Sequence, residues 1–248
     1  MDMKKILAAF TAAAAVSAMA IDSSNIVGYQ EVSVPAGSSM RTATFKAISG
    51  NYKISDIKVN GAAGGGADTA QKINADGSWG ALYYYLTMDG TGYVEDGWYK
   101  DDYGGDAVTD ADVLGFGEAF QITASSNFTV TYAGQVVAGN PTVSVPMGSS
   151  MAGNPTPVEV KMSEITVTGA SGGGADTAQK INANGSWGAL YYYLTMDGTG
   201  YVEDGWYKDD YGGDAVTDAD VLAPGESLQF TASGNLTLTF PAVLPAAE

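Results

Sequence analysis

The sequence predicts an all-β protein made of two tandem copies of one unit, each β-sandwich-like or barrel-like with roughly seven or eight strands. Residues 61–114 recur at 169–222 with only two differences, Ala63/Ser171 and Asp76/Asn184, and such a repeat indicates one folding unit written twice. Glycines and short polar turns separate segments rich in β-branched and aromatic residues, which is typical of β proteins. No segment after residue 20 keeps the apolar period of a helix.

The repeat extends beyond its near-identical centre. Residues 32–40 match 143–151 with a shift of 111, and residues 117–124 match 225–232 with a shift of 108. The second copy has therefore lost three residues in the loop between these segments. We expect the first unit at 21–134 and the second at 135–248. No Pro/Ser-rich or charged linker separates them, so we expect the two units to abut.

The first twenty residues are typical of a secretory signal peptide. Lys4 and Lys5 precede an apolar, alanine-rich stretch, and Ala18-Met19-Ala20 is a cleavage site of the small-x-small kind. The apolar stretch is shorter than the ~20 residues that a membrane-spanning helix needs. We therefore expect a secreted protein that is periplasmic, on the cell surface or extracellular. We expect no membrane span in the mature chain.

Alternating large side chains predict individual strands. At 128–132 every second residue is large and apolar, and at 236–240 the same positions stay apolar while their shapes change. A half-buried strand requires this, because successive side chains point to opposite faces. Further strands are expected at 26–34, 42–45, 54–59, 81–87, 93–99 and 120–123. In the strand at 81–87, Leu82, Tyr84 and Leu86 are expected to face the core.

The composition excludes several kinds of chemistry. The chain has no His and no Cys, so Ser-His-Asp and Cys-His catalysis, His-ligated zinc and thiol redox chemistry are excluded. Its 28 acidic and 11 basic residues give a net charge of −17. Such a surface repels nucleic acid and anionic membranes, because both bind clustered Lys and Arg. It suits cations, or simply favours solubility.

An acidic segment at 89–112, repeated at 197–220, is the candidate metal site. It holds eight carboxylates and one lysine among several glycines. Calcium takes about six to eight oxygen ligands, largely carboxylates and carbonyls. The candidate ligands are Asp101, Asp102, Asp106, Asp110 and Asp112, with Asp209, Asp210, Asp214, Asp218 and Asp220 in the second copy. The alternative is a solvated acidic loop that binds no metal.

Two short patterns resemble known families. Residues 102–112 resemble a dockerin-type calcium loop, but Gly104 replaces a ligand Asn and no Gly follows Asp106. A strand is also expected where that family has a helix, so the resemblance implies only a looser calcium site in a β-loop. A wider pattern is similar to uncharacterised exported bacterial β-repeat proteins, and it implies no particular activity. It consists of Asn25-Ile26-Val27-Gly28-Tyr29, Gly97-Trp98-Tyr99 and Gly117-Glu118-Ala119-Phe120.

Aromatic side chains form the second candidate site. The candidate ligand-binding residues are Trp79, Tyr83, Tyr85 and Tyr103, with Trp187, Tyr191, Tyr193 and Tyr211 in the second copy. Flat rings stack on sugar faces, and neighbouring carboxylates accept hydrogen bonds from hydroxyls. The alternatives are core packing and cross-strand aromatic pairs. Trp98 is expected in the core, whereas exposure or contact between the units is an equally strong interpretation for Tyr83 and Tyr85.

These observations favour a non-catalytic surface or extracellular module, binding or structural, whose partner is a polysaccharide or a cell-surface component. Calcium is the one cofactor that the acidic segments suggest. Duplication provides two equivalent sites, and avidity strengthens weak binding when both engage one polymer. The alternative is a glycoside hydrolase that works with carboxylates alone. Asp96, Asp101 and Asp106 are its candidate residues.

Overall fold

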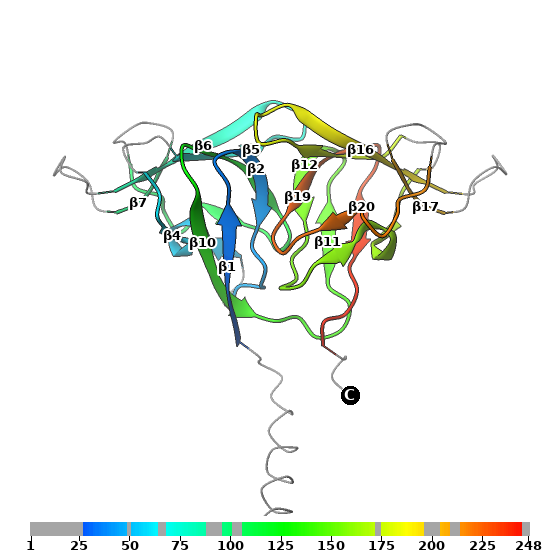
Figure 1. Cartoon of the computed structure of the whole chain (residues 1–248), viewed down its shortest axis with the longest axis horizontal. Coiled ribbons are helices and arrows are strands. Elements are labelled where there is room, and N and C mark those ends of the chain that lie inside the picture. The colour runs from blue at the N-terminus through cyan, green and yellow to red at the C-terminus, as the bar shows by residue number, and fades with distance from the viewer. Residues whose placement is uncertain are drawn as a thin grey trace, which may run out of the picture.

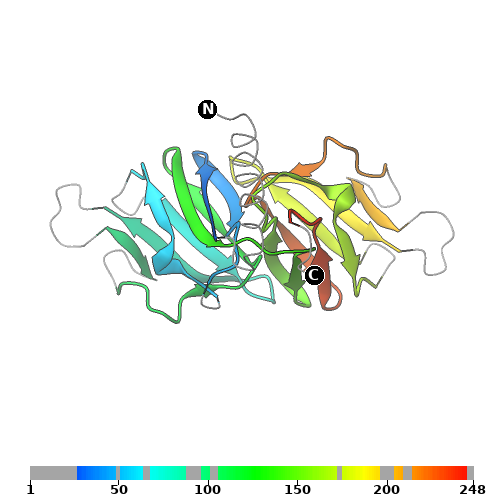
Figure 2. The ribbon, with the colours of Figure 1, turned by 90° about the horizontal axis from the view of Figure 1, so that it is seen from below.

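The computed structural model describes residues 27–48, 51–63, 68–87, 96–100, 106–171, 175–195, 204–208 and 214–244. This part of the chain is all-β, as predicted, with small antiparallel sheets arranged like a four-bladed propeller. Within these ranges the only helical segments are two short 3₁₀ turns. The two copies of the repeat lie side by side, and each presents the same succession of strands (Figures 1 and 2).

The first copy forms ten strands and one 3₁₀ turn within the described residues. They are β1 (Val27–Val34), β2 (Gly37–Thr42), β3 (Tyr52–Lys53), η2 (Ile54–Asp56), β4 (Lys58–Asn60), β5 (Asp68–Ile73), β6 (Trp79–Leu86), β7 (Gly97–Lys100), β8 (Val113–Leu114), β9 (Ala119–Ala124) and β10 (Phe128–Gln135). Three antiparallel sheets result, with the strand orders β2-β9-β5-β6-β7, β1-β10-β4 and β3-β8.

The second copy repeats this pattern strand for strand. Its elements are β11 (Thr142–Val145), β12 (Gly148–Gly153), β13 (Val160–Lys161), η3 (Met162–Glu164), β14 (Thr166–Thr168), β15 (Thr177–Ile181), β16 (Trp187–Leu194), β17 (Gly205–Lys208), β18 (Val221–Leu222), β19 (Ser227–Ala232) and β20 (Leu236–Thr239). The sheets have the orders β12-β19-β15-β16-β17, β11-β20-β14 and β13-β18. Within the described ranges no sheet contains strands of both copies, so the strand pairing follows the sequence repeat.

Most predicted strands are confirmed, and two are wrong. The segments at 26–34, 81–87, 120–123 and 128–132 fall in β1, β6, β9 and β10. The segment at 93–99 is confirmed only in part by β7, because residues 93–95 lie outside the described ranges. The strand expected at 42–45 is wrong, because β2 already ends at Thr42.

The strand expected at 54–59 begins instead as the 3₁₀ turn η2. The backbone amide of Ile57 donates to the carbonyl of Ile54 over 3.1 Å. Both isoleucines are fully buried, and a 3₁₀ turn places side chains three residues apart on the same side. Burial of both side chains therefore selects the turn over an extended strand.

Each copy encloses its own apolar core. The first core joins side chains of the five-stranded and three-stranded sheets, among them Phe120, Ile122 and Val130. The second core is built in the same way around Leu228, Phe230 and Leu238. Burial of this apolar surface is the main favourable contribution to folding in a chain without disulfides.

A third, smaller core joins the two copies. Met40, Ala119 and Met151 are buried together, and Ile73 and Ile181 pack against them. Met40 and Met151 occupy equivalent positions of the repeat, as do Ile73 and Ile181. This core therefore lies on a pseudo-two-fold axis that relates the two copies.

Backbone hydrogen bonds across the junction obey the same pseudo-symmetry. Ser38 donates its amide proton to the carbonyl of Ala183 over 2.7 Å, and the equivalent Ser149 donates to Ala75 over 2.8 Å. A second equivalent pair runs from Thr42 to Gly225 at 2.9 Å and from Gly153 to Gly117 at 3.1 Å. The junction therefore has the isologous geometry of a symmetric dimer interface, realised within one chain.

Candidate functional site

Four of the six tyrosines predicted as ligand-binding residues lie inside the protein. Tyr83 and Tyr85 expose 3% and 9% of their surface, and Tyr191 and Tyr193 expose 2% and 7%. Their rings belong to the two main cores. A buried ring cannot stack on a sugar, so exposure of these four side chains is a wrong prediction.

The face of β6 that packs against the core is opposite to the predicted one. Leu82 and Tyr84 are only half-buried, although Leu86 is buried as expected. The inward face carries Tyr83, whose hydroxyl donates to Asp112 over 3.3 Å. It also carries Tyr85, whose ring meets Trp98 edge to face at 5.2 Å. An internal acceptor for the hydroxyl and an aromatic partner for the ring make burial of the tyrosines favourable. Trp98 is buried in the core as predicted.

Asp112 and its equivalent Asp220 are buried parts of the scaffold. The Asp112 carboxylate accepts hydrogen bonds from the Lys100 side chain at 2.9 Å and from the Thr109 amide and hydroxyl at 2.9 and 3.1 Å. Burial by itself raises the pKa of Asp112, but the bonds from Lys100 and Thr109 outweigh it and hold the pKa at about 2. Asp220 has the same surroundings and also a pKa of about 2.

The other predicted calcium ligands lie apart or outside the described ranges. Asp110 pairs with Lys53 at 2.8 Å and Asp218 with Lys161 at 2.9 Å. Asp106 and Asp214 are exposed. Within the described ranges no group of three or more acidic side chains is placed to hold a metal ion. The residues that lie outside these ranges are Asp101, Asp102, Tyr103, Asp209, Asp210 and Tyr211. Calcium binding therefore stays a prediction.

Trp79 and Trp187 are the two candidate ligand-binding residues that the structure exposes. Each exposes 48% of its surface and opens the strand β6 or β16. Their equivalence in the repeat places them symmetrically about the junction. A half-exposed indole presents a flat apolar face, which is what a sugar ring or an extended chain requires for stacking.

A rigid polar turn positions each tryptophan. The carboxylate of Asp76 accepts from the amide and the hydroxyl of Ser78 at 2.9 and 2.6 Å. The backbone amide of Asn74 donates to the backbone carbonyl of Ser78 at 2.8 Å, which closes the turn before Trp79. In the second copy Asn184 takes the place of Asp76 and makes the same two bonds to Ser186. The backbone carbonyl of Ala75, in the same turn, accepts a hydrogen bond from the Ser149 amide of the second copy. The turn is therefore held by its own hydrogen bonds and by the junction.

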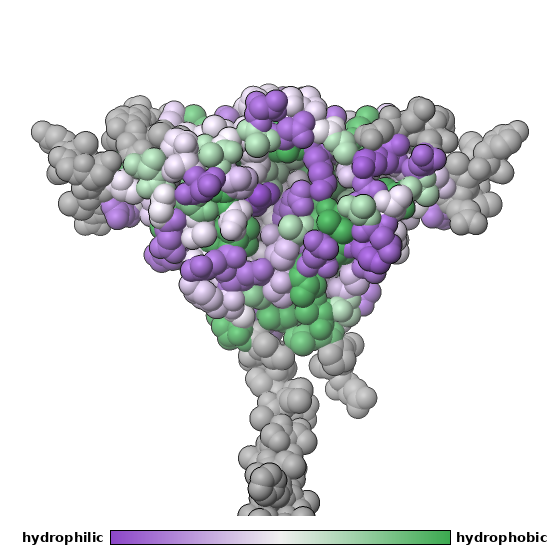
Figure 3. All heavy atoms as spheres, in the orientation of Figure 1, coloured by the Kyte–Doolittle hydropathy of each residue, from purple (hydrophilic) through white to green (hydrophobic). Residues whose placement is uncertain are grey.

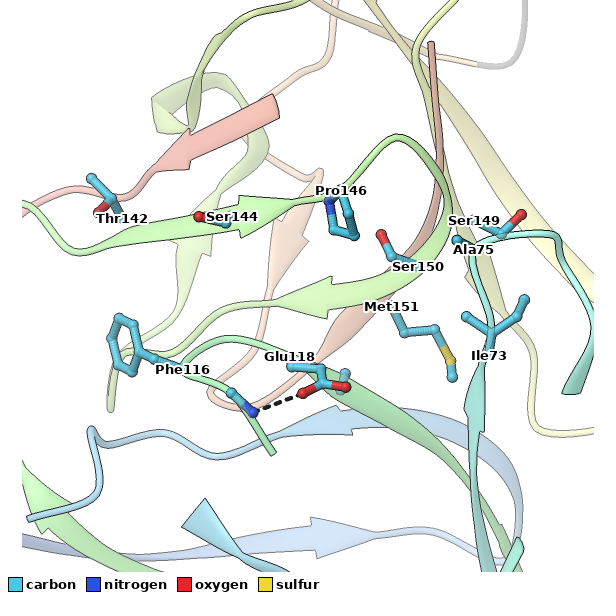
Figure 4. Close-up of a pocket in the computed structure, with 12 residues that line it drawn as sticks. Ile73, Ala75, Phe116, Glu118, Thr142, Ser144, Pro146, Ser149, Ser150 and Met151 are labelled. Carbon is cyan, nitrogen blue, oxygen red and sulfur yellow. Dashed lines mark hydrogen bonds between the residues drawn. The ribbon is translucent and has the colours of Figure 1, made fainter. Parts of the chain in front are cut away.

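The sequence did not reveal a groove at the junction of the two copies. Its volume is about 530 Å³, and both copies line it. Figure 4 shows Phe116 and Glu118 on one side and Thr142, Ser144 and Pro146 on the other. Glu118 is held there by Lys72 at 2.7 Å and by the amide of Gly115 at 2.7 Å. The sequence predicted two abutting units but gave no signal that brings these residues of the two copies together.

The surface around these features is largely polar. Figure 3 shows hydrophilic residues over most of one face, with apolar residues gathered towards its lower end. Among the described residues no helix has the length and apolar character that a membrane crossing demands. No protein-family model, curated protein or solved structure matches the chain. The function is therefore argued from the geometry of the chain itself.

Proposed function

We propose that the chain is a non-catalytic, exported module that binds polysaccharide through Trp79 and Trp187. The observation that carries this proposal is the pair of half-exposed indoles at equivalent positions of the repeat. The other two tryptophans, Trp98 and Trp206, are buried at 3% and 4%. The exposed pair therefore needs an explanation other than core packing.

The surroundings of the two indoles suit a sugar ligand. Polar groups of Asn74, Asp76 and Ser78 lie in the turn beside Trp79, and they offer hydrogen-bonding groups next to an apolar ring face. Sugar binding combines these two kinds of contact. The neutral Asn184 in the second copy keeps the turn without the charge. A neutral polymer therefore fits both sites better than a charged one.

Two linked sites explain why the unit is duplicated. A single stacked ring contributes about 1 kcal/mol beyond the area it buries, which by itself gives weak binding. Two sites on one rigid body raise the apparent affinity for a polymer by about a hundredfold or more when both engage the same chain. The backbone hydrogen bonds at the junction hold the two turns in a fixed relation.

The proposal also covers the β-sandwich fold of each unit, export of the protein and calcium binding. The five-stranded and three-stranded sheets of each copy share one core, which supports the description of each unit as a β-sandwich. The signal-like segment supports export. The acidic composition of residues 89–112 and 197–220 supports calcium binding. The carboxylate-based glycoside hydrolase stays the alternative. Of its candidate residues, Asp96 and Asp106 are exposed and Asp101 lies outside the described ranges.

Retention on polysaccharide matrices tests the proposal. We expect the native chain to be retained, Trp79→Ala and Trp187→Ala each to lose about tenfold or more of the apparent affinity, and the double variant to lose retention. Tyr29→Ala is the matched control, because Tyr29 is a 67% exposed aromatic residue on another strand. Runs with calcium and with a chelator test the metal part. A glycan array without hits, or full retention of the double variant, contradicts the proposal.

A further inference from the structure

The pseudo-symmetry of the junction creates two equivalent grooves, and only one of them is open. The open groove is lined by Glu118, Ser149, Ser150 and Met151, among others. The equivalent residues of the other copy are, in the same order, Glu226, Ser38, Ser39 and Met40. The second set lines two smaller cavities, of about 350 and 130 Å³, on the opposite side of the junction.

Arg41 divides the second groove. It lines both small cavities, and so does Glu226. In the open groove the position of Arg41 is taken by Ala152. The backbone pairing is the same on both sides, because Arg41 forms an isolated β-bridge with Glu226 and Ala152 forms one with Glu118. Arg41 is therefore a side chain that one groove contains and the other lacks, and the linings also differ by Pro224 in place of Phe116 and Glu31 in place of Thr142.

The Arg41 side chain is a largely buried cation in the second groove. One terminal nitrogen donates to the carbonyl of Met40 over 3.0 Å, while the buried Nε has no hydrogen-bond partner among the described residues. Burial lowers the pKa of Arg41, and the negative charge of Glu226 opposes that effect. The groove thus tolerates a largely desolvated cation because a carboxylate stands beside it.

The carboxylate of the open groove is prepared in the same way. Glu118 is held by Lys72 at 2.7 Å and by the Gly115 amide at 2.7 Å. Glu226 is held by Lys180 at 3.0 Å and by the Ala223 amide at 2.9 Å. The Glu118 side chain is 42% exposed against 26% for Glu226. The open groove therefore has the same lysine-bonded carboxylate without an arginine side chain beside it.

We propose that the open groove binds the guanidinium group of an arginine side chain from a partner peptide, and that Arg41 is the built-in occupant of the equivalent groove. Phe116 and Pro146 are among the residues that line the groove in Figure 4, and they offer apolar contacts to the aliphatic stem of an arginine. The hydroxyl of Ser150 is buried in the wall without a partner among the described residues. It offers a further acceptor to an entering cation. This site is separate from the tryptophans and independent of sugar binding.

Titration of the full chain with acetyl-arginine amide tests the proposal, with acetyl-citrulline amide as the uncharged probe of nearly the same shape. Backbone amide shifts of Gly115 and Glu118 report on the open groove, and those of Ala223 and Glu226 report on the filled one. We expect one binding event, at the open groove. We expect the citrulline probe to bind about tenfold more weakly or not at all, because it offers no charge-assisted hydrogen bond.

Three variants make the test specific. Ala152→Arg fills the open groove in the manner of Arg41, and we expect it to abolish binding. Arg41→Ala opens the second groove, and we expect the stoichiometry to rise from one to two. Glu118→Gln removes the charge without adding volume, and we expect about a tenfold loss. Glu226→Gln is its matched control and should leave binding by the native open groove unchanged.

Several outcomes overturn the proposal. They are a native chain that does not bind the arginine probe, equal binding of the citrulline probe, and unchanged binding by Ala152→Arg. Binding of the arginine probe by Arg41→Ala but not by the native chain also overturns it, because the open groove then does not bind arginine. If Ala152→Arg does not fold, Glu118→Gln and Glu226→Gln decide the matter, since neither changes the volume of the groove.

Discussion

The two copies of the repeat are nearly identical in their centres, and one marked exchange lies where they meet. Residues 61–114 and 169–222 are nearly identical, and their buried contacts agree, down to the surroundings of Asp112 and Asp220. The exchange of Arg41 for Ala152 lies at the junction instead. Because a junction on a pseudo-two-fold axis has two equivalent sides, such an exchange makes one side different from the other without disturbing either core.

The shortened loop of the second copy shows how one copy adapts by itself. Asn154 is fully buried there, and its side-chain amide donates to the carbonyls of Val158 and Leu222 at 2.7 and 3.1 Å. Its carbonyl oxygen accepts from the amide and the hydroxyl of Thr156 at 3.0 and 2.7 Å. The first copy has Ala43 at the equivalent position. A buried amide that satisfies all its partners thus organises the shorter connection.

The largest effect on this comparison is expected from the glycines that begin β2 and β12. Gly37 and Gly148 have φ values of +99° and +95°. A Cβ atom at these positions would stand 2.0 Å from the carbonyl of Ala183 and 2.2 Å from that of Ala75. We expect Gly37→Ala and Gly148→Ala each to lower the free energy of unfolding by about 3 kcal/mol or more, because both the backbone angle and the junction oppose a side chain.

Urea unfolding of the full chain measures this loss. Gly77→Ala is the matched control. Its φ is +85°, but its Cβ would meet only the Ser149 hydroxyl at 3.3 Å, so we expect a loss of about 1 kcal/mol. Equal losses for the two junction glycines would show that both sides of the junction contribute alike. Losses no larger than that of Gly77→Ala would mean that the junction is not the close contact described.

The second prediction concerns acid, where the two copies should behave alike. The pKa values of Asp112 and Asp220 in the folded chain are about 2, below the ordinary value of 3.8. A depressed folded pKa stabilises the fold above the unfolded value, and this contribution disappears as the pH falls from about 4 to about 2. We expect each carboxylate to account for about 1–2 kcal/mol of that loss, allowing for solvent screening.

Urea unfolding at pH 7, 4 and 2.5 tests this expectation. Asp112→Asn should be less stable than the native chain at pH 7 and should lose less stability on acidification. Asp112→Asn combined with Asp220→Asn should double both effects, because the two sites lie in separate cores and act independently. A native chain whose stability does not change between pH 4 and pH 2.5 would contradict the buried ion pairs.

The sequence predicted the strands best where the two copies have diverged. At 128–132 and 236–240 the side chains changed shape but kept their alternation, and β10 and β20 lie there. The strand at 37–42 shows no alternation of large apolar side chains in the sequence, because Gly37, Ser38 and Ser39 are small or polar. Backbone pairing with β9 and two hydrogen bonds to the second copy place this strand, and they depend on no particular side chain.

The candidate site was predictable only in part, for a related reason. Large side chains occupy both faces of 81–87, so the alternation could not decide which face is buried. Distant partners decided it, with Asp112 for the hydroxyl of Tyr83 and Trp98 for the ring of Tyr85. Trp79 and Trp187 were predicted as ligand-binding residues and are exposed. The groove required two copies to be placed in space, which a one-dimensional repeat does not do.

The smallest expected effect tests a position where the two cores differ by one hydroxyl. Tyr132 is fully buried, and its hydroxyl has no hydrogen-bond partner among the described residues. Burial raises the pKa of this hydroxyl. The equivalent residue of the second copy is Phe240, which is buried without a polar group. The second core therefore shows that the site does not need the oxygen.

We expect Tyr132→Phe to raise the free energy of unfolding by about 1 kcal/mol, because a buried polar atom without a partner costs desolvation. The ring would keep its edge-to-face contact with Tyr52, whose centroid lies 5.5 Å away. Tyr52→Phe is the matched control. Its hydroxyl donates to the carbonyl of Ala133 and accepts from the amide of the same residue, so we expect a loss of about 1–2 kcal/mol. Equal losses for the two variants would mean that the Tyr132 hydroxyl has a hydrogen-bond partner in solution.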